Sequence, residues 1–186
     1  MSLFEKYRLG QPLPDFLAKY ANDAQKLRWK AAHEQIALTT AQRQLLASFS
    51  RSMNVLCLAG AWCGDCINQC PIFEHFAASA PSLAVRYLDR DEHAEVQREL
   101  QINGGNRVPV LVFFSEDGKE VARYGERTLS KYRQMMRDQT GPACPTGILI
   151  PGDPLLNLVT QDWLNEFERV QWLLRLSPRL RQMHGD

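Results

Sequence analysis

The amino-acid sequence predicts an α/β fold in which a central mixed sheet is flanked by helices, with extra helices at the N- and C-termini. Between residues 54 and 139, short apolar runs alternate with segments whose apolar residues recur at helical spacing. Strands that alternate with helices form a parallel sheet covered on both faces, and a hairpin turn at 116–119 adds an antiparallel edge. We therefore expect three regions: a helical extension packed on the core (1–53), the α/β core (54–139), and an irregular segment with a C-terminal helix (140–186).

The first region contains two helical patterns. Apolar residues recur at three- and four-residue steps from Pro12 to His33, which predicts one long helix with Pro14 in its first turn. A second helix is expected from Thr40 to Phe49, capped by a threonine.

The core elements follow from changes in apolar spacing. Asn54–Gly60 is a continuous apolar run, which is typical of a buried parallel strand. Helical spacing returns from Cys63 to Ala80, and Pro71 is expected to kink that helix. The remaining elements are a strand at 83–89, a short helix at 92–100, strands at 109–115 and 120–124, a helix at 128–139, an irregular proline- and glycine-rich segment at 141–158, and a helix at 160–176 that stops before Pro178.

The composition argues against several classes of function. The chain has 186 residues, 45% of them hydrophobic, and a formal net charge of +1, so we expect no charge-driven binding to nucleic acid or to a membrane. No stretch approaches the roughly 20 apolar residues that span a bilayer. The N-terminus lacks the pattern of a secretory signal, and five cysteines do not suggest a secreted disulfide framework. We expect a cytoplasmic protein, unless a signal has been removed.

Two of the cysteines form a Cys-x-x-Cys pair at the junction of a strand and a helix. Cys63 and Cys66 follow directly on the first core strand and open the helix after it. Thiol–disulfide exchange needs a thiolate, and the free N–H groups and partial positive charge of a helix N-terminus lower a thiol pKa. We assign Cys63, which receives most of this field, as the attacking nucleophile, and Cys66, one turn further in, as the resolving thiol.

The residues around this pair resemble the thioredoxin superfamily. Residues 61–66, Ala-Trp-Cys-Gly-Asp-Cys, are similar to the Trp-Cys-Gly-Pro-Cys site of that family, and Val108-Pro109 precedes a strand where the family has a cis-proline. The resemblance covers residues 54–139 and implies a thioredoxin-like fold for the core. Two glycines lie in and near the family's hairpin positions: Gly118 and Gly125.

The resemblance also implies a role for each matched residue. Trp62 is expected to shield the cysteines and to line the surface on which a substrate docks, beside Gly64 and Asp65. Pro109 is expected to be cis and to face the cysteines, since X–Pro bonds adopt the cis form at little cost. The backbone of Val108 is expected to pair with a substrate peptide, in the manner of strand addition.

Three departures separate this chain from thioredoxin itself. Asp65 stands where thioredoxin has proline, so the redox potential should differ; a carboxylate disfavours a nearby thiolate but can also cap the helix. Cys57 stands where thioredoxin has a buried aspartate that helps to move protons for the resolving cysteine, so that task is absent or falls to another group such as Asp65. The helices of residues 1–53 replace thioredoxin's first strand and helix, as in decorated bacterial relatives with a Trp-Cys-Gly-Asp-Cys site.

The leading hypothesis is a thiol–disulfide oxidoreductase that acts through a mixed disulfide at Cys63, with no bound cofactor and no metal. Its partners would be disulfide-containing proteins or small-thiol substrates, and an external electron donor such as a reductase or a low-molecular-weight thiol. A non-catalytic binding or scaffold module with a thioredoxin-like core is the alternative.

The other cysteines carry weaker expectations. Cys57 and Cys70 are expected to be small apolar residues of the core, and Cys144 an incidental thiol in a loop. A role as a third exchange partner stays open for Cys70 and Cys144. Cys70 and His75 lie near the pair in sequence and suggest a zinc site, although one helix turn of ligands rarely encloses a metal.

Overall fold

The computed structural model describes residues 1–138 and 154–186. Within these ranges a mixed sheet has four strands in the order β2-β1-β3-β4. Its members are β1 (Met53–Ala59), β2 (Leu83–Asp89), β3 (Val110–Ser115) and β4 (Glu120–Gly125). Strand β1 pairs parallel with β2 and antiparallel with β3, and β4 pairs antiparallel with β3 at the edge. The predicted fold class is confirmed: a mixed sheet with an antiparallel hairpin, flanked by helices.

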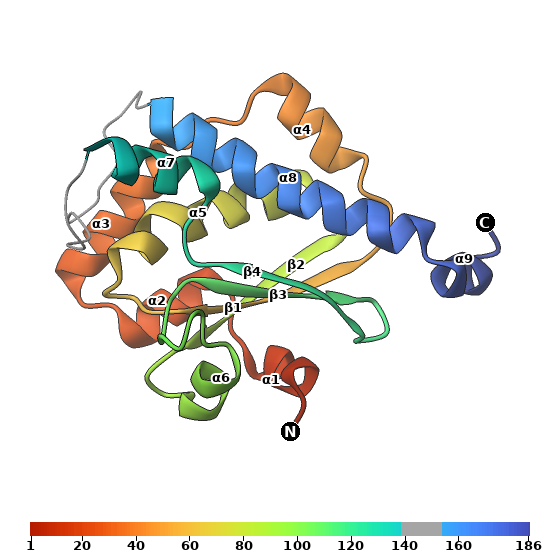
Figure 1. Ribbon diagram of the computed structural model, residues 1–186, viewed down its shortest axis with the longest axis horizontal. Coiled ribbons are helices and arrows are strands. Elements are labelled where there is room, and N and C mark those ends of the chain that lie inside the picture. The colour runs from red at the N-terminus through yellow and green to blue at the C-terminus, as the bar shows by residue number, and fades with distance from the viewer. Residues whose placement is uncertain (139–153) are drawn as a thin grey trace.

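One face of the sheet carries most of the helices (Figure 1). Helix α5 (Gly64–Ser79) lies on this face, and α3 (Asp23–Glu34) and α4 (Thr40–Ala47) pack against it. The long helix α8 (Pro154–Leu176) crosses α5 and β4 and contacts α7 (Leu129–Asp138). Helix α5 is continuous through Pro71. No helix in the described parts of the chain is long and apolar enough to cross a membrane.

The opposite face is covered more thinly. Helices α1 (Leu3–Leu9) and α6 (Ala94–Glu99) lie on this side (Figure 1), and α2 (Leu13–Tyr20) packs against β2. Just before α2, Gln11 forms an isolated antiparallel bridge with Tyr87 through two backbone hydrogen bonds of 2.8 and 2.9 Å. This bridge extends the backbone pairing of the sheet beyond β2 by one residue.

Aromatic side chains from three elements fill the core between the sheet and its helices. Phe73 on α5 lies 4.7 Å from Trp163 on α8, and Phe113 on β3 lies 5.1 Å from Phe167 on α8, measured between ring centroids. All four side chains are completely buried. Because such rings bury large areas and prefer edge-to-face contact, α8 is part of the core of the folded protein.

The prediction of one helix over residues 12–33 was wrong. The chain forms two helices, α2 and α3, separated at Ala21 and Asn22. The side chain of Asn22 accepts from the backbone N–H of Gln25, and Gln25 reaches back to the N–H of Asn22. This reciprocal capping box starts a new helix, and apolar periodicity alone does not reveal it.

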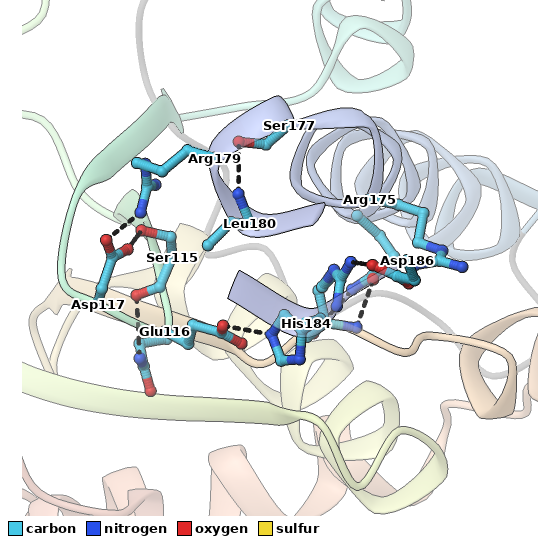
Figure 2. Close-up of polar contacts among 12 residues, drawn as sticks. Ser115, Glu116, Asp117, Arg175, Ser177, Arg179, Leu180, His184 and Asp186 are labelled. Atoms are coloured by element: carbon cyan, nitrogen blue, oxygen red, sulfur yellow. Dashed lines mark hydrogen bonds and ion pairs between the residues drawn. The ribbon is translucent and has the colours of Figure 1, made fainter. Parts of the chain in front are cut away.

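The C-terminal segment extends further than the sequence predicted. Helix α8 begins at Pro154 instead of residue 160, and an additional helix, α9 (Pro178–His184), follows it. Ser177 caps α9, and Pro178 occupies its first turn, where a missing N–H costs nothing. Figure 2 shows α9 beside the turn between β3 and β4, where the His184 ring nitrogen lies 2.5 Å from a carboxylate oxygen of Glu116.

Candidate active site

The Cys-x-x-Cys pair lies at the carboxyl end of β1, where α5 begins. Cys63 is the N-cap residue of α5, and its carbonyl accepts the backbone N–H of Ile67 at 2.9 Å. Its own N–H donates to the carbonyl of Gly60 at 3.0 Å, which closes the turn after the strand. Cys63 is partly buried, whereas Cys66, in the first turn of the helix, is completely buried. The structure therefore places the two thiols at the strand-to-helix junction that the sequence predicted.

The segment just before β3 lies beside the partly buried Cys63 thiol. The Val108–Pro109 peptide bond is cis, and the Cys63 Sγ lies 3.7 Å from the carbonyl oxygen of Val108. Gly125, at the end of β4, permits this arrangement. A Cβ atom at position 125 would lie 2.5 Å from the carbonyl oxygen of Pro109. Residues far apart in the sequence are thus brought to one point beside Cys63.

The expectation that Cys63 has the lowered pKa is wrong, because the thiols of Cys63 and Cys66 affect each other's ionisation and the lowered pKa is that of Cys66. A hydrogen bond with the Cys66 thiol, together with burial, raises the pKa of Cys63. Burial also raises the pKa of Cys66, but hydrogen bonds with the Cys63 and Cys70 thiols and with the N–H of Gly60 outweigh it and hold that pKa below its usual value. The pair thus loses its first proton readily and its second with difficulty. Accessibility then decides which sulfur meets a substrate, and only Cys63 is accessible.

Trp62 stands beside the cysteines at the surface. Its side chain is 45% exposed, and its indole N–H donates to Asp91 at 3.1 Å. The guanidinium carbon of Arg90 lies 4.5 Å from a Trp62 ring centroid, within the range of a cation–π contact. The loop after β2 thus holds the indole in place while leaving part of it open to solvent.

Asp65 and Gly64 occupy the first turn of α5 in different surroundings. Asp65 is buried, and its carboxylate pairs with Arg127 at 2.9 Å. Both side chains are about nine-tenths buried, so this ion pair is largely shielded from water. Around Gly64, by contrast, no atom lies within 4 Å of the position that a Cβ would take. The surface above the first turn is therefore open.

Buried hydrogen bonds connect this site to α8. Gln69 on α5 donates to the carbonyl of Glu126 at 2.8 Å, and Trp163 on α8 donates to the Gln69 side-chain oxygen at 2.8 Å. Glu126 precedes Arg127, the partner of Asp65. The segment after β4 is therefore fixed to α5 by an ion pair and to α8 through Gln69.

A tryptophan from the N-terminal extension supports the turn before Cys63. Trp29 on α3 is almost completely buried, and its indole N–H donates to the carbonyl of Ala61 at 2.8 Å. No motif in the sequence marks Trp29 or Arg127 as a residue of the site. A buried indole N–H needs an acceptor, which is a general signal, but nothing in the sequence identifies Ala61 as that acceptor.

A family model for thioredoxin matches residues 10–140, well over half of the chain. The chain belongs to the thioredoxin family. The match begins before α2, so it includes helices that the sequence resemblance, limited to residues 54–139, left outside the core.

Curated members of the thioredoxin superfamily match shorter parts of the chain. Thioredoxin from Chlamydia pneumoniae is 34% identical over 62 residues, covering 33% of this chain and 57% of that protein. Protein disulfide-isomerase tigA from Aspergillus niger is 31% identical over 85 residues, covering 43% of this chain and 23% of that protein. The chain thus spans less than two thirds of the length of these relatives.

Two solved structures share the fold over nearly the whole chain. A protein of unknown function from Pseudomonas aeruginosa superimposes with a TM-score of 0.70 at 15% identity, covering 90% of this chain and 98% of that chain. An HIV epitope scaffold gives a TM-score of 0.62 at 14% identity, covering 100% of this chain and 99% of that chain. At such identities the likeness shows the fold alone, and it extends well beyond residues 54–139.

The structure describes two of the departures from thioredoxin. The carboxylate of Asp65, which stands in place of proline, faces Arg127. Cys57, which stands in place of a buried aspartate, is completely buried, with its Sγ 3.8 Å from the Sγ of Cys70. The position therefore holds a thiol in contact with another thiol.

Residues 1–138 and 154–186 contain no group of three or more histidine, cysteine, aspartate or glutamate side chains that could hold a metal ion. The ring of His75 packs against that of His33 at a tilt, with 4.3 Å between ring centroids. Cys144 lies outside the described residues, so its expected place in a loop stays a prediction.

Proposed function

We propose that this protein is a thiol–disulfide oxidoreductase that reduces disulfides through Cys63 and Cys66. One observation carries the proposal. The partly buried Cys63 thiol stands at the start of α5, beside Val108 and the cis Pro109, with the fully buried Cys66 in the same helical turn. A substrate sulfur has access to the first thiol and is shielded from the second.

The reaction has two exchange steps. The Cys63 thiolate attacks one sulfur of the substrate disulfide, and the other substrate sulfur leaves as a thiolate and takes up a proton. The Cys66 thiolate then attacks the Cys63 sulfur of the mixed disulfide, and the second substrate sulfur leaves. The substrate gains two electrons and becomes a dithiol, while the enzyme is left with a Cys63–Cys66 disulfide.

The surrounding residues fit the binding of an extended peptide. Trp62 offers an exposed apolar ring beside the nucleophile, and the open surface above Gly64 leaves room for the substrate chain. The backbone of Val108 would pair with that chain, since Pro109 has no N–H of its own to offer. Asp65 would tune the potential of the pair, with Arg127 offsetting its charge.

The partners and the direction belong to the same proposal. We infer substrates that are disulfide-containing proteins or small disulfides, and an external donor, either a reductase or a low-molecular-weight thiol, that reduces the Cys63–Cys66 disulfide again. No bound cofactor is needed, because the cysteines carry the electrons themselves. Cysteine usage favours action as a reductase in the cytoplasm.

The test is a reduction assay with insulin as the substrate and dithiothreitol as the donor. The wild-type protein should accelerate reduction of insulin, and Cys63→Ser should abolish that acceleration because the attacking sulfur is gone. Cys144→Ser is the matched control, a cysteine substitution outside the Cys-x-x-Cys motif, and should keep wild-type activity. Cys66→Ser should accumulate mixed disulfides, because the resolving step is blocked.

A binding module without catalysis gives a different set of results. The wild-type protein and Cys63→Ser would then give the same rate of insulin reduction. That result would overturn the proposed function.

A further inference from the structure

Two further thiols, which the proposed reaction does not use, are buried in the core near the active-site pair. Cys57 on β1 and Cys70 on α5 place their Sγ atoms 3.8 Å apart, and both side chains are completely buried. The sulfur–sulfur bond of a disulfide is about 2.05 Å long, so the two Sγ atoms would have to move roughly 1.8 Å closer to form one. No substrate can reach either sulfur from outside.

Cys66 connects this inner pair with Cys63. Cys66 and Cys70 are four residues apart on α5, which places them on one face of the helix, and each thiol shifts the pKa of the other. Pro71 follows Cys70 and has no N–H, so this turn of α5 lacks one backbone hydrogen bond. The backbone around Cys70 can therefore shift more easily than in an uninterrupted helix. Each thiol is thus coupled to the next, from Cys63 to Cys66, from Cys66 to Cys70, and from Cys70 to Cys57.

We propose that Cys57 and Cys70 are a second, internal redox pair that returns electrons to Cys63 and Cys66 by thiol–disulfide exchange. This inference rests on the proposed function, because the oxidant of the inner pair is the Cys63–Cys66 disulfide left after a substrate has been reduced.

The exchange balances without another reagent. The Cys70 thiolate attacks the Cys66 sulfur, so the Cys63–Cys66 bond breaks, a Cys66–Cys70 bond forms and Cys63 leaves as a thiolate. The Cys57 thiolate then attacks the Cys70 sulfur, forming Cys57–Cys70 and releasing Cys66. Two electrons pass from the inner pair to the outer pair, and the protons of Cys57 and Cys70 are replaced on Cys63 and Cys66.

The surroundings of Cys57 and Cys70 make their exchange with the outer pair slow. Burial raises the pKa of Cys57 and of Cys70, and the charge of Glu74 raises that of Cys57 further, so thiolate is scarce there. The outer pair should therefore react first and the inner exchange should follow more slowly. A fully reduced chain would then reduce two substrate disulfides instead of one.

The experiment counts thiols in the absence of a donor. In a Cys144→Ser background four cysteines remain, namely Cys57, Cys63, Cys66 and Cys70. The protein is reduced with dithiothreitol, freed of it by desalting, and incubated anaerobically with a large excess of insulin. Samples are quenched with acid, unfolded, alkylated with N-ethylmaleimide and weighed by mass spectrometry, and the disulfides are then mapped on peptides.

We expect two phases: rapid loss of two alkylatable thiols, then slow loss of the other two, with peptides linked through Cys57–Cys70 and Cys63–Cys66. An end point with Cys57 and Cys70 still alkylated would overturn the internal pair and leave the proposed function intact, and these cysteines would then be small core residues. Retention of all four thiols would overturn the proposed function itself. Any other stable pairing would also overturn the internal pair.

Substitutions of the inner cysteines test the number of disulfides that one chain can reduce. Cys57→Ala and Cys70→Ala, each in the same background, should halve the insulin disulfides reduced per chain, because only one disulfide can then form within the enzyme. If either variant fails to fold, the time course and peptide map of the Cys144→Ser protein still decide the question. Capacity unchanged in a folded variant would contradict the proposal.

Discussion

The two ends of the central sheet are held together by different kinds of contact. At the carboxyl end of β1, beside the cysteines, the polar contacts are buried. Trp29 donates to the carbonyl of Ala61 from inside the core, and Asp65 pairs with Arg127 where each side chain is about one tenth exposed.

At the other end, α9 meets the turn between β3 and β4 mainly through exposed ion pairs (Figure 2). The side chains of Arg179 and Asp117 are 45% and 28% exposed, and those of His184 and Glu116 are also partly open to solvent. The exception in this part of the molecule is Arg51, which is buried and reaches Asp186 at 2.5 Å.

The buried contacts hold the residues around Cys63 in place, whereas the exposed contacts attach α9 to the rest of the protein. When one partner of a buried polar pair is removed, the other stays buried with neither water nor protein to bond to, so the loss of folding stability is large. Exposed pairs exchange their partner for water and lose little. We therefore expect the geometry around Cys63 to depend on Trp29, Asp65 and Arg127 and to be insensitive to α9.

The largest effect is expected from Arg127→Met. The substitution keeps an apolar stem but removes the Arg127 guanidinium from the buried carboxylates of Asp65 and Glu126, and breaking a buried ion pair typically costs about 3–5 kcal/mol. Urea unfolding should show this loss in the free energy of unfolding. The double variant with Asp65→Leu should recover much of the loss, since the Asp65 charge is then gone and Glu126 still lies 3.5 Å from Arg107. A loss below about 1 kcal/mol in Arg127→Met, the range of an exposed pair, would mean that the two ends do not differ.

Trp29→Phe should give the next largest effect. The phenyl ring cannot donate to Ala61, and an unsatisfied buried carbonyl costs about 1–3 kcal/mol, to which the lost ring volume adds. Because Ala61 precedes Trp62 and Cys63, insulin reduction should also fall severalfold. Trp172→Phe is the matched control: this indole is 49% exposed, so its stability should change by no more than about 0.5 kcal/mol. Equal losses of stability in Trp29→Phe and Trp172→Phe would contradict the greater importance of the buried contact.

Gly125→Ala should destabilise the protein by crowding the cis proline. The new Cβ would lie 2.5 Å from the carbonyl oxygen of Pro109, and overpacking of this kind costs about 1–3 kcal/mol. Gly64→Ala is the contrasting change, because nothing lies within 4 Å of its Cβ. Since glycine is about 1 kcal/mol less favourable than alanine in a helix, Gly64→Ala should raise the thermal midpoint while Gly125→Ala lowers it. A rise in both variants would show that the close approach to Pro109 is unimportant.

The central part of the fold was predictable because its signals are local. The apolar run before Cys63 and the turn at 116–119 gave strands within one or two residues of β1, β3 and β4. The N-terminal helices were less predictable, since the break at Asn22 depends on a capping box inside continuous apolar periodicity. The end of α8 before Pro178 was predicted, whereas α9 was missed because a proline that ends one helix can also begin the next.

The candidate site was predictable only where a motif marks it. Cys63 and Cys66 are recognisable from spacing, and Pro109 from the resemblance. Arg127 is an ordinary charged residue in the sequence, and it meets Asp65 only because β4 brings it there. The contact between Cys57 and Cys70 was equally hidden, because a strand residue and a helix residue 13 positions apart have no fixed spatial relation in a sequence.

The smallest effect is expected at α9. Arg179→Ala removes an exposed pair with Asp117, which is worth about 0.2–1 kcal/mol and should shrink further in high salt. The hydroxyl of Ser115, followed by Arg179, holds the pKa of Asp117 below its usual value, so this stabilisation is present at neutral pH and is lost as the pH falls through that lowered pKa. Unfolding curves of Arg179→Ala and of the wild type should therefore converge in acid and at high ionic strength, while insulin reduction stays unchanged. A marked loss of reductase activity in Arg179→Ala would show instead that the two ends of the sheet are coupled.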